Sequence, residues 1–155
     1  MPGSLQALVS LTGLGLRISV ASNQSAVGRG LMTPRQLEQV LAAMRTQAEA
    51  AGARIDAMYV CSHAPEAHCG CRKPAPGLIR SAVQDSGIPQ GETLVVGDDV
   101  RDVEAARAAG VNVVMVRTGK GLRASAELQQ RGAVLPVFDD LAQLARALQD
   151  QPTHD

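Results

Sequence analysis

Short apolar runs alternate with segments of helical periodicity along almost the whole chain, and this alternation restricts the fold more than any other feature. Five runs predict strands, at about residues 16–21, 55–60, 93–96, 111–116 and 133–138. Six segments predict helices, over about residues 5–14, 34–51, 77–86, 100–109, 122–131 and from 141 onward. Such alternation is typical of a parallel sheet between two helical layers. We therefore expect an α/β fold with a doubly wound, mostly parallel, Rossmann-like sheet and helices on both faces.

Individual residues mark where several predicted helices begin and end. Thr33 and Gln36 form the pattern of a capping box, and Pro34 occupies the first helical position between them. Ser4 is expected to cap the first helix in the same way. Three later helices are expected to end at glycines, which adopt the left-handed conformation easily: Gly52, Gly87 and Gly110.

Length and composition restrict the class of protein. The 155 residues predict a single domain over residues 1–150, with residues 151–155 as a frayed tail. The net charge is zero and Tyr59 and Phe138 are the only aromatic residues, so the chain lacks the basic surface and the stacking platform of a nucleic-acid binder. No apolar run reaches the ~18 residues that a membrane span needs. We expect a monomer that binds a small molecule and neither nucleic acid nor membrane.

Three polar segments each follow a predicted strand, at residues 22–30, 61–73 and 98–102. The carboxyl ends of parallel strands meet at one edge of a sheet, and ligands of such folds bind at that edge. We therefore expect the three segments to converge on one site.

The second polar segment contains every cysteine of the chain. It contains two closely spaced pairs of potential ligands, which we call clips: a Cys-x-His clip at Cys61 and His63, and a Cys-x-Cys clip at Cys69 and Cys71. Three thiolates and one imidazole suit a closed, structural zinc site. His68 is a rival for the nitrogen position, and three unligated cysteines are the alternative to a metal. An odd cysteine count in one short stretch favours a metal in a reducing compartment over a disulfide framework, so we expect a cytoplasmic protein.

Charged residues follow the cysteines and the third strand. Arg72 and Lys73 come directly after the last cysteine, where a metal-fixed loop would let them grip an anion; an exposed charged loop is the alternative. Asp98 ends the third predicted strand and suits Mg²⁺. The alternative is that Asp98 or Asp99 caps the next helix, whose first turn contains Asp102.

The polar residues after the first strand are Ser22, Asn23, Gln24 and Ser25. Their short side chains can donate hydrogen bonds to phosphate oxygens. The same residues are also frequent in ordinary turns, and that alternative stays open.

Four segments together resemble one family. They are ASNQSAVGRG at 21–30, C-S-H…C-G-C-R-K-P-A-P-G at 61–77, V-V-G-D-D-V-R-D at 95–102 and V-R-T-G-K-G at 116–121. The chain resembles haloacid-dehalogenase-like (HAD-like) phosphatases of the zinc-containing D-glycero-D-manno-heptose 1,7-bisphosphate 7-phosphatase group. The related histidinol-phosphate phosphatases share much of this pattern. The resemblance extends in order from Pro2 to about Gly121.

The resemblance implies a role for each matching residue. Two residues would handle the transferring phosphoryl group, Ser22 by a hydrogen bond and Lys73 by its charge. Four residues would contact the substrate: Asn23, Gln24, Ser25 and Arg72. Metal would be bound by the zinc ligands Cys61, His63, Cys69 and Cys71 and by the Mg²⁺ ligand Asp98, with Asp102 in support. The implied reaction releases phosphate from a sugar phosphate in the synthesis of a lipopolysaccharide core precursor.

The chain also departs from the family. The family opens with a strand that ends in Asp-x-Asp-Gly, which supplies the nucleophile and the general acid/base, and no Asp-x-Asp occurs in these 155 residues. Ala26 and Asp99 replace a usual Gly and a frequent Lys or Ser. We therefore expect a sheet that lacks its first, central strand, with a gap or a repair between residues 16–21 and 93–97.

Three functions follow for the chain. The first is a phosphatase of the heptose bisphosphate, with residues 1–155 alone inactive and Mg²⁺ weak or absent. The second is a histidinol-phosphate phosphatase. The third is a non-catalytic zinc-containing domain that binds sugar phosphates, and an Asp-x-Asp-Gly strand encoded upstream of Met1 would argue against it.

Overall fold

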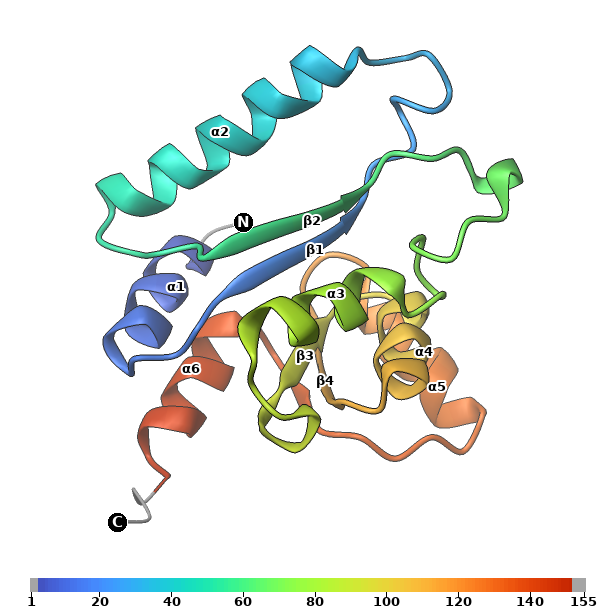
Figure 1. Cartoon of the computed structure of the whole chain (residues 1–155). Coiled ribbons are helices and arrows are strands. Elements are labelled where there is room, and N and C mark those ends of the chain that lie inside the picture. Colours follow the sequence, from blue (N-terminus) through green and yellow to red (C-terminus); the bar gives the residue numbers. More distant parts are fainter. Residues whose placement is uncertain (1–2, 152–155) are drawn as a thin grey trace.

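The computed structural model describes residues 3–151 and follows the predicted alternation of strands and helices (Figure 1). Within this range the strands are β1 (Ser19–Asn23), β2 (Ala57–Cys61), β3 (Leu94–Gly97), β4 (Asn112–Val116) and β5 (Val137–Phe138). The α-helices are α1 (Ser4–Gly13), α2 (Pro34–Ala50), α3 (Gly77–Ser86), α4 (Val100–Ala109), α5 (Gly121–Gln130) and α6 (Leu141–Gln149). Pro2 and most of the tail expected to fray, residues 152–155, lie outside the described range.

The strands form two separate sheets, and every pair in them is parallel. β1 pairs with β2, from Ser19 opposite Ala57 to Asn23 opposite Cys61. β4 lies between β3 and β5. Among the described residues no strand pairs with the second edge of β1 or of β3. This split confirms the expected gap in the middle of the sheet.

A mostly apolar cavity of about 370 Å³ occupies the space between the two sheets. Residues of β1, β3, α1, α3 and α6 line it, among them Val20, Ile79, Val95 and Leu144. The cavity also reaches Lys73 and Asp102, which line a separate polar pocket as well. The empty space in the sheet therefore leads to the polar edge where the predicted site lies.

The helix ends follow local sequence, with one correction. The Thr33 side chain accepts a hydrogen bond from the Gln36 backbone, and the Gln36 side chain accepts one from the Thr33 backbone, which confirms the capping box. The prediction for Ser4 was wrong: Gly3 is the N-cap residue of α1, and no side chain caps that helix. Ser4 lies inside the first turn, because the chain enters the helix one residue earlier than expected.

The strand boundaries also differ from the prediction. β1 begins at Ser19 and extends to Asn23, so Ser22 and Asn23 belong to the strand and not to the loop that follows it. Parallel pairing with β2 explains the extension, because Ser22 and Asn23 lie opposite Val60 and Cys61. The last strand is confined to Val137–Phe138.

Packing is unequal across the two sheets. Helix α4 and strand β4 contribute side chains with 0% exposure: Val103, Ala105, Ala106 and Met115. Helix α2, which Figure 1 shows on the outer side of the β1–β2 sheet, has 17 residues but buries only Leu37 and Ala48.

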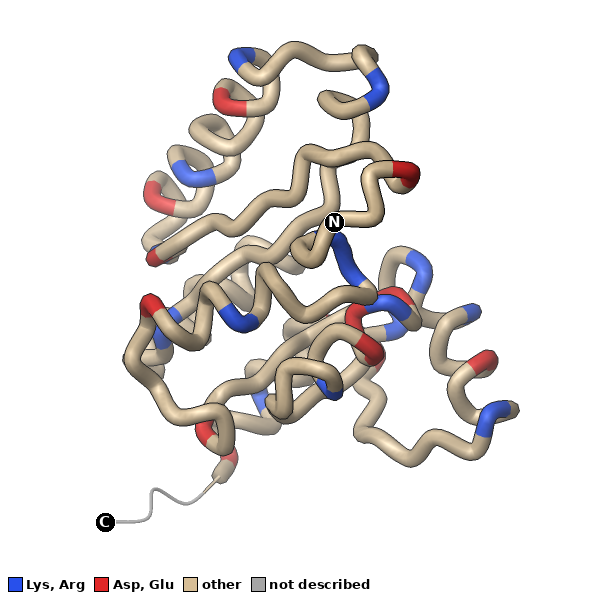
Figure 2. Tube along the Cα trace, turned by 45° about the vertical axis from the view of Figure 1, so that its right-hand side comes forward, with Lys and Arg blue, Asp and Glu red and all other residues tan. Residues whose placement is uncertain are grey.

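Acidic and basic residues are interspersed along the trace (Figure 2). None of the helices in residues 3–151 combines the length and the apolar character that crossing a membrane requires.

Candidate metal centre and phosphate pocket

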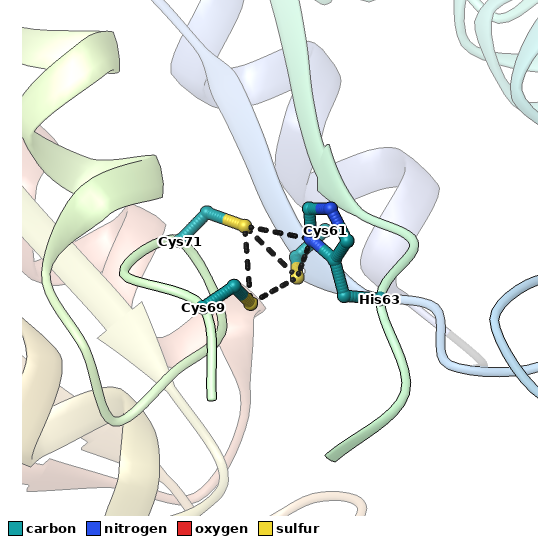
Figure 3. Close-up of side chains that lie close together, drawn as sticks. All are labelled: Cys61, His63, Cys69 and Cys71. Atoms are coloured by element: carbon teal, nitrogen blue, oxygen red, sulfur yellow. Dashed lines mark hydrogen bonds between the residues drawn. The ribbon is translucent and has the colours of Figure 1, made fainter. Parts of the chain in front are cut away.

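Four potential metal ligands meet in one cluster beyond the end of β2 (Figure 3). Cys61 is the last residue of β2, and His63, Cys69 and Cys71 follow on the loop. The Sγ atom of Cys71 lies 3.1 Å from that of Cys61 and 3.4 Å from that of Cys69. The Nδ1 atom of His63 lies 3.3 Å from the Cys71 sulfur and 3.5 Å from the Cys61 sulfur. All four ligand atoms lie within 4.8 Å of one another.

The cluster fits a tetrahedral metal ion. Zinc bonds of about 2.3 Å to sulfur and 2.0–2.1 Å to nitrogen place neighbouring ligand atoms roughly 3.5–3.8 Å apart, close to the separations in the cluster. Soft sulfur and imidazole donors match zinc better than the oxygen-seeking cations Mg²⁺ and Ca²⁺. Because the cluster offers four protein ligands, a tetrahedral ion bound there would have no position open for substrate, which is typical of structural zinc sites.

The pKa values of the cysteine thiols also favour a bound cation in the cluster. Burial opposes ionisation of Cys69, but the Arg72 backbone N–H and the Cys71 and Cys61 thiols donate to its sulfur, and its pKa falls to about 6. The Cys61 side chain and burial raise the pKa of Cys71 to about 12. Three thiolates in such proximity repel one another, so a divalent cation is needed for all of them to ionise at neutral pH.

The position of His68 decides between the two histidines. His68 is exposed, has a left-handed backbone with φ of 47° at the end of the short 3₁₀ turn Pro65–Ala67, and does not belong to the cluster. His63 does belong to it. The geometry therefore supports the Cys-x-His clip as the source of the nitrogen ligand.

Two glycines let neighbouring backbone pack against the metal loop. A Cβ atom on Gly28 would lie 2.3 Å from the Ala64 nitrogen, and one on Gly77 would lie 2.5 Å from the Gly70 carbonyl oxygen. The Gly28 N–H donates to Ser62, and the Gly77 N–H donates to Gly70. The loop is thus held between residues 22–32 and the start of α3.

The residue after this loop, Lys73, is anchored at both its backbone and its side chain. Its backbone exchanges two hydrogen bonds of 3.0 Å with the Asn23 side chain at the end of β1. Its Nζ atom lies 2.6 Å from Asp102 Oδ1 and donates to the Ala21 carbonyl oxygen at 2.8 Å. Lys73 therefore ties β1 to the start of α4 across the gap in the sheet.

A polar pocket of about 180 Å³ lies at this junction. Five of the predicted site residues line it: Ser22, Asn23, Lys73, Asp98 and Asp102. Three residues predicted to contact the substrate do not line it, namely Gln24, Ser25 and Arg72, and neither do the four predicted zinc ligands. Gln24 contacts the pocket indirectly, because its Nε2 atom donates to the Ser22 hydroxyl at 2.9 Å. Three residues were not predicted to belong to the site but line it: Asp99, Arg101 and Lys120.

The three aspartates of the pocket have different partners. Asp102 Oδ2 accepts from the backbone N–H groups of Asp98 and Asp99, both at 3.1 Å. Asp99 caps α4 and accepts from the Arg101 backbone and side chain, and this pairing holds the pKa of Asp99 well below its usual range. The capping alternative thus applies to Asp99. Asp98 is left facing the pocket, and its Oδ2 accepts from the Lys120 N–H.

Tight glycines mark both backbone turns of this pocket. A Cβ on Gly97 would meet the Asp102 side chain at 2.4 Å, and one on Gly121 would meet the Val116 carbonyl oxygen at 1.6 Å. The Gly-Asp-Asp and Gly-Lys-Gly patterns contain these residues, so the glycine of the second pattern is the sequence signal that could have pointed to Lys120.

Comparisons with known proteins identify the family of the chain. A HAD-hydrolase-like family model matches residues 70–144. The D-glycero-beta-D-manno-heptose-1,7-bisphosphate 7-phosphatase of Pseudomonas aeruginosa is 36% identical over 96% of this chain and 82% of its own length. The enzyme of that name from Neisseria meningitidis serogroup B is 36% identical over 97% of this chain and 81% of its own length. The crystal structure of the D,D-heptose 1,7-bisphosphate phosphatase of B. bronchiseptica with magnesium and phosphate matches with a TM-score of 0.91 at 34% identity, covering 98% of this chain and 84% of that one.

The parallel α/β fold is that of HAD-like hydrolases. Within this class, the matches to the heptose bisphosphate phosphatases cover more than 80% of each relative's length. The chain belongs to the HAD-like phosphatase family of the D-glycero-beta-D-manno-heptose-1,7-bisphosphate 7-phosphatases. This confirms the family resemblance drawn from the four motifs.

Proposed function

We propose that this chain forms the phosphate-binding framework of a cytoplasmic, monomeric phosphatase that removes the 7-phosphate of D-glycero-D-manno-heptose 1,7-bisphosphate. The observation that carries the proposal is the placement of Lys73. Its ammonium group lies between the end of β1 and the start of α4 and lines a pocket with Ser22, Asn23 and Asp98. A largely buried point charge beside short hydrogen-bond donors suits a phosphoryl group. The relatives of this chain bear the name of that activity.

Each predicted residue has a specific task in this proposal. Ser22 and Lys73 stabilise the transferring phosphoryl group, Asn23 holds Lys73 through its backbone, and Gln24 orients the Ser22 hydroxyl. Arg72 contacts the substrate, and one of its nitrogens, Nη1, is buried with no hydrogen-bond partner among the described residues. A buried N–H without a partner destabilises a protein, so the Arg72 side chain would gain a hydrogen bond by turning toward a phosphate oxygen in the pocket, which it does not line in this structure. Ser25 contacts the substrate from the loop beside the pocket.

The proposal includes two metal ions with separate tasks. Zinc would be held by Cys61, His63, Cys69 and Cys71, and as a structural ion it would fix the loop that presents Arg72 and Lys73. Mg²⁺ would be held by Asp98, with Asp102 orienting the backbone around it. When bound, Mg²⁺ would neutralise charge on the phosphoryl oxygens.

Residues 1–155 nevertheless lack a nucleophile for the family reaction. That reaction needs a carboxylate in line with the ester and a separate acid for the leaving oxygen. Asp102 is already bound by Lys73 and two backbone N–H groups, and Asp99 is bound by Arg101. Because the sequence contains no Asp-x-Asp, we predict that residues 1–155 bind phosphate without hydrolysing its esters.

Orthophosphate binding to the zinc-loaded protein, measured by calorimetry, tests the phosphate pocket. Lys73→Ala and Arg72→Ala are each expected to weaken binding at least about tenfold, because a charge-assisted hydrogen bond contributes roughly 1.5–3 kcal/mol. The zinc content should stay unchanged. Arg35→Ala, at an exposed position on α2, is the matched control. Unchanged affinity in the double variant at positions 72 and 73 would exclude these residues from the phosphate site.

Assays of phosphate release distinguish the functions themselves. Residues 1–155 should release no phosphate from the heptose bisphosphate or from histidinol phosphate. Robust Mg²⁺-dependent release that Asp98→Asn abolishes would show that another residue acts as nucleophile. Release from histidinol phosphate alone would favour the related histidinol-phosphate phosphatases.

If a chain extended with an Asp-x-Asp-Gly strand binds phosphate but stays inactive, the third function, a non-catalytic zinc-containing phosphate-binding domain, would be favoured.

A further inference from the structure

All three cysteines of the chain lie in the metal cluster, and all three are free thiols in the structure. Their exposure differs. Cys61, at the end of β2, is 1% exposed, whereas Cys69 and Cys71 on the loop are half-buried and His63 is exposed. The loop side of the cluster is therefore open to solvent, and a small oxidant can reach the sulfurs of Cys69 and Cys71 there.

The closest pair of sulfurs joins two different segments of the chain (Figure 3). The Sγ atoms of Cys61 and Cys71 lie 3.1 Å apart, closer than the other two pairs, which are 3.4 Å and 3.5 Å apart. A disulfide has its sulfurs about 2.05 Å apart, so this pair needs to approach by only about 1 Å. A bond between Cys69 and Cys71, with only Gly70 between them, would instead close a small, strained ring.

The loop can supply this movement. Cys61 is fixed by its place in β2, but within residues 62–76 the 3₁₀ turn Pro65–Ala67 is the only helical or strand element. The same loop is connected to the polar pocket. Lys73 comes two residues after Cys71, and its backbone exchanges hydrogen bonds of 3.0 Å with the Asn23 side chain. A displacement of Cys71 is therefore transmitted directly to Lys73.

We propose that Cys61 and Cys71 form an oxidative modification site, in which a peroxide converts the pair to a disulfide, zinc is released and phosphate binding is lost. The Cys71 thiolate attacks one peroxide oxygen, the O–O bond breaks, and hydroxide leaves while a sulfenic acid remains on Cys71. The Cys61 thiolate then displaces a second hydroxide from that sulfur. Each sulfur loses one electron and each peroxide oxygen gains one, so two thiolates and one peroxide give one disulfide and two hydroxide ions.

The disulfide removes two of the four metal ligands, because the thiolate is the form of cysteine that binds metal. His63 and Cys69 alone do not complete a tetrahedral site, so zinc dissociates as Zn²⁺ without any change of its own charge. A thiol reductant restores both thiolates, as is usual for disulfides that sense redox state in a reducing compartment. Only the loss of phosphate binding rests on the proposed function; the disulfide and the zinc release do not.

Hydrogen peroxide, added in small molar excess to the zinc-loaded protein, tests the modification site. A chromogenic chelator should record one zinc released for each disulfide formed, and the denatured protein should be lighter by two hydrogen atoms. Dithiothreitol with added Zn²⁺ should reverse both changes. Proteolysis after Glu66 separates Cys61 from the other two cysteines, so the disulfide should link two fragments. Fragmentation at Gly70 in the mass spectrometer then identifies Cys71 as the partner.

His68→Ala is the matched control, because this exposed histidine of the same loop lies outside the cluster, and it should release zinc as wild type does. Retention of zinc by the oxidised protein would overturn the site, and so would a disulfide that involves Cys69. Zinc loss through sulfinic acids that dithiothreitol does not reverse would overturn it too.

Orthophosphate binding, measured by calorimetry before and after oxidation, tests the connection to the pocket. Affinity should fall at least about tenfold, because Lys73 loses its position and with it a charge-assisted hydrogen bond, and reduction with added Zn²⁺ should restore it. Equal affinity of the reduced and the oxidised protein would overturn the connection. Reduced, zinc-loaded protein that binds no orthophosphate would overturn the proposed function, and the disulfide and zinc release would then still identify the modification site.

Discussion

The two sheets of this protein are built from similar elements but are stabilised in different ways. In the half that contains β3, β4 and β5, β4 has a strand on each side, and the α4 and β4 side chains of Val103 and Met115 are fully buried. In the half that contains β1 and β2, the apolar side chains Val40 and Met44 of α2 are 49% and 41% exposed. The first half has a dense apolar core, whereas the second has only a small buried cluster around Ala48, Ala53 and Ile55.

Polar and metal-binding residues provide much of the order in the second half. The cluster around Cys61 ties the end of β2 to its loop, and Asn23 and Lys73 tie that loop to β1. Lys73 then reaches Asp102 in the opposite half, and Ala7 and Ala145 pack α1 on α6. The predicted site residues therefore lie on the junction between the halves, where the same contacts serve both folding and binding.

Metal removal should cause the largest loss of stability and the largest difference between the two halves. Chelation, or Cys71→Ser, is expected to lower the free energy of unfolding by more than about 4 kcal/mol, because a structural metal site contributes its binding energy to folding. Amide hydrogen exchange should accelerate most in β1 and β2 and least in β4. His68→Ala is the matched control. A metal-free, fully folded protein as stable as its Cys71→Ser variant would contradict the metal site.

The unequal packing predicts unequal responses to the same substitution in two strands. Val114 of β4 is 6% exposed, and Val96 of β3 is 38% exposed. Val114→Ala should destabilise the protein by roughly 2 kcal/mol, and Val96→Ala by less than half of that, in proportion to the apolar surface each buries. Denaturant unfolding measures both. Equal losses would mean that β3 is covered in solution.

Filling the cavity should produce a smaller effect of opposite sign. Ala82 of α3 lines the apolar space between the sheets. Ala82→Leu is expected to raise the free energy of unfolding by about 1 kcal/mol, as cavity-filling substitutions commonly do. Thermal unfolding provides the measurement, with Ala43→Leu on the exposed side of α2 as control. A destabilised variant would show that the space is already filled or collapsed.

The smallest effect concerns the Asp99–Arg101 pair. The Arg101 hydrogen bonds hold the pKa of Asp99 far below its unfolded value, so the pair stabilises the fold above about pH 4 and loses this contribution as the pH falls further. Asp99→Asn should lower the stability at pH 7 by less than about 1 kcal/mol and flatten its decline below pH 4. Parallel stability curves for wild type and variant would contradict the pairing.

Local patterns were sufficient to predict several features. The Thr33 capping box joins residues only three positions apart, and the Cys/His cluster needs only one loop to close. The limits of β1 could not be predicted in this way, because pairing with β2 extends the strand through Ser22 and Asn23. Hydrogen bonds between distant segments outweighed the turn preference of these polar residues.

The polar pocket also combines residues that local sequence predicts with residues that only packing brings together. Asp98 and Asp102 follow a buried strand, and their position at its carboxyl end was predictable. Nothing in the local sequence distinguishes Arg101 from an ordinary surface cation of a helix. The contact of Asp99 with Lys120, which lies in the loop between β4 and α5, depends on the packing of two βα units, as does the orientation of Arg101 toward Asp99.

By itself, the sequence determined the order of strands and helices, the metal-ligand set and the absence of an Asp-x-Asp nucleophile, because these depend on periodicity, spacing and residue identity alone. Only the tertiary structure decided that the sheet stays open and is not repaired by direct pairing of β1 with β3, that Lys73 spans the junction, and that Arg101 and Lys120 share Asp99. The physical reason is that these contacts join residues far apart in the chain, and their energy exists only once both segments are packed.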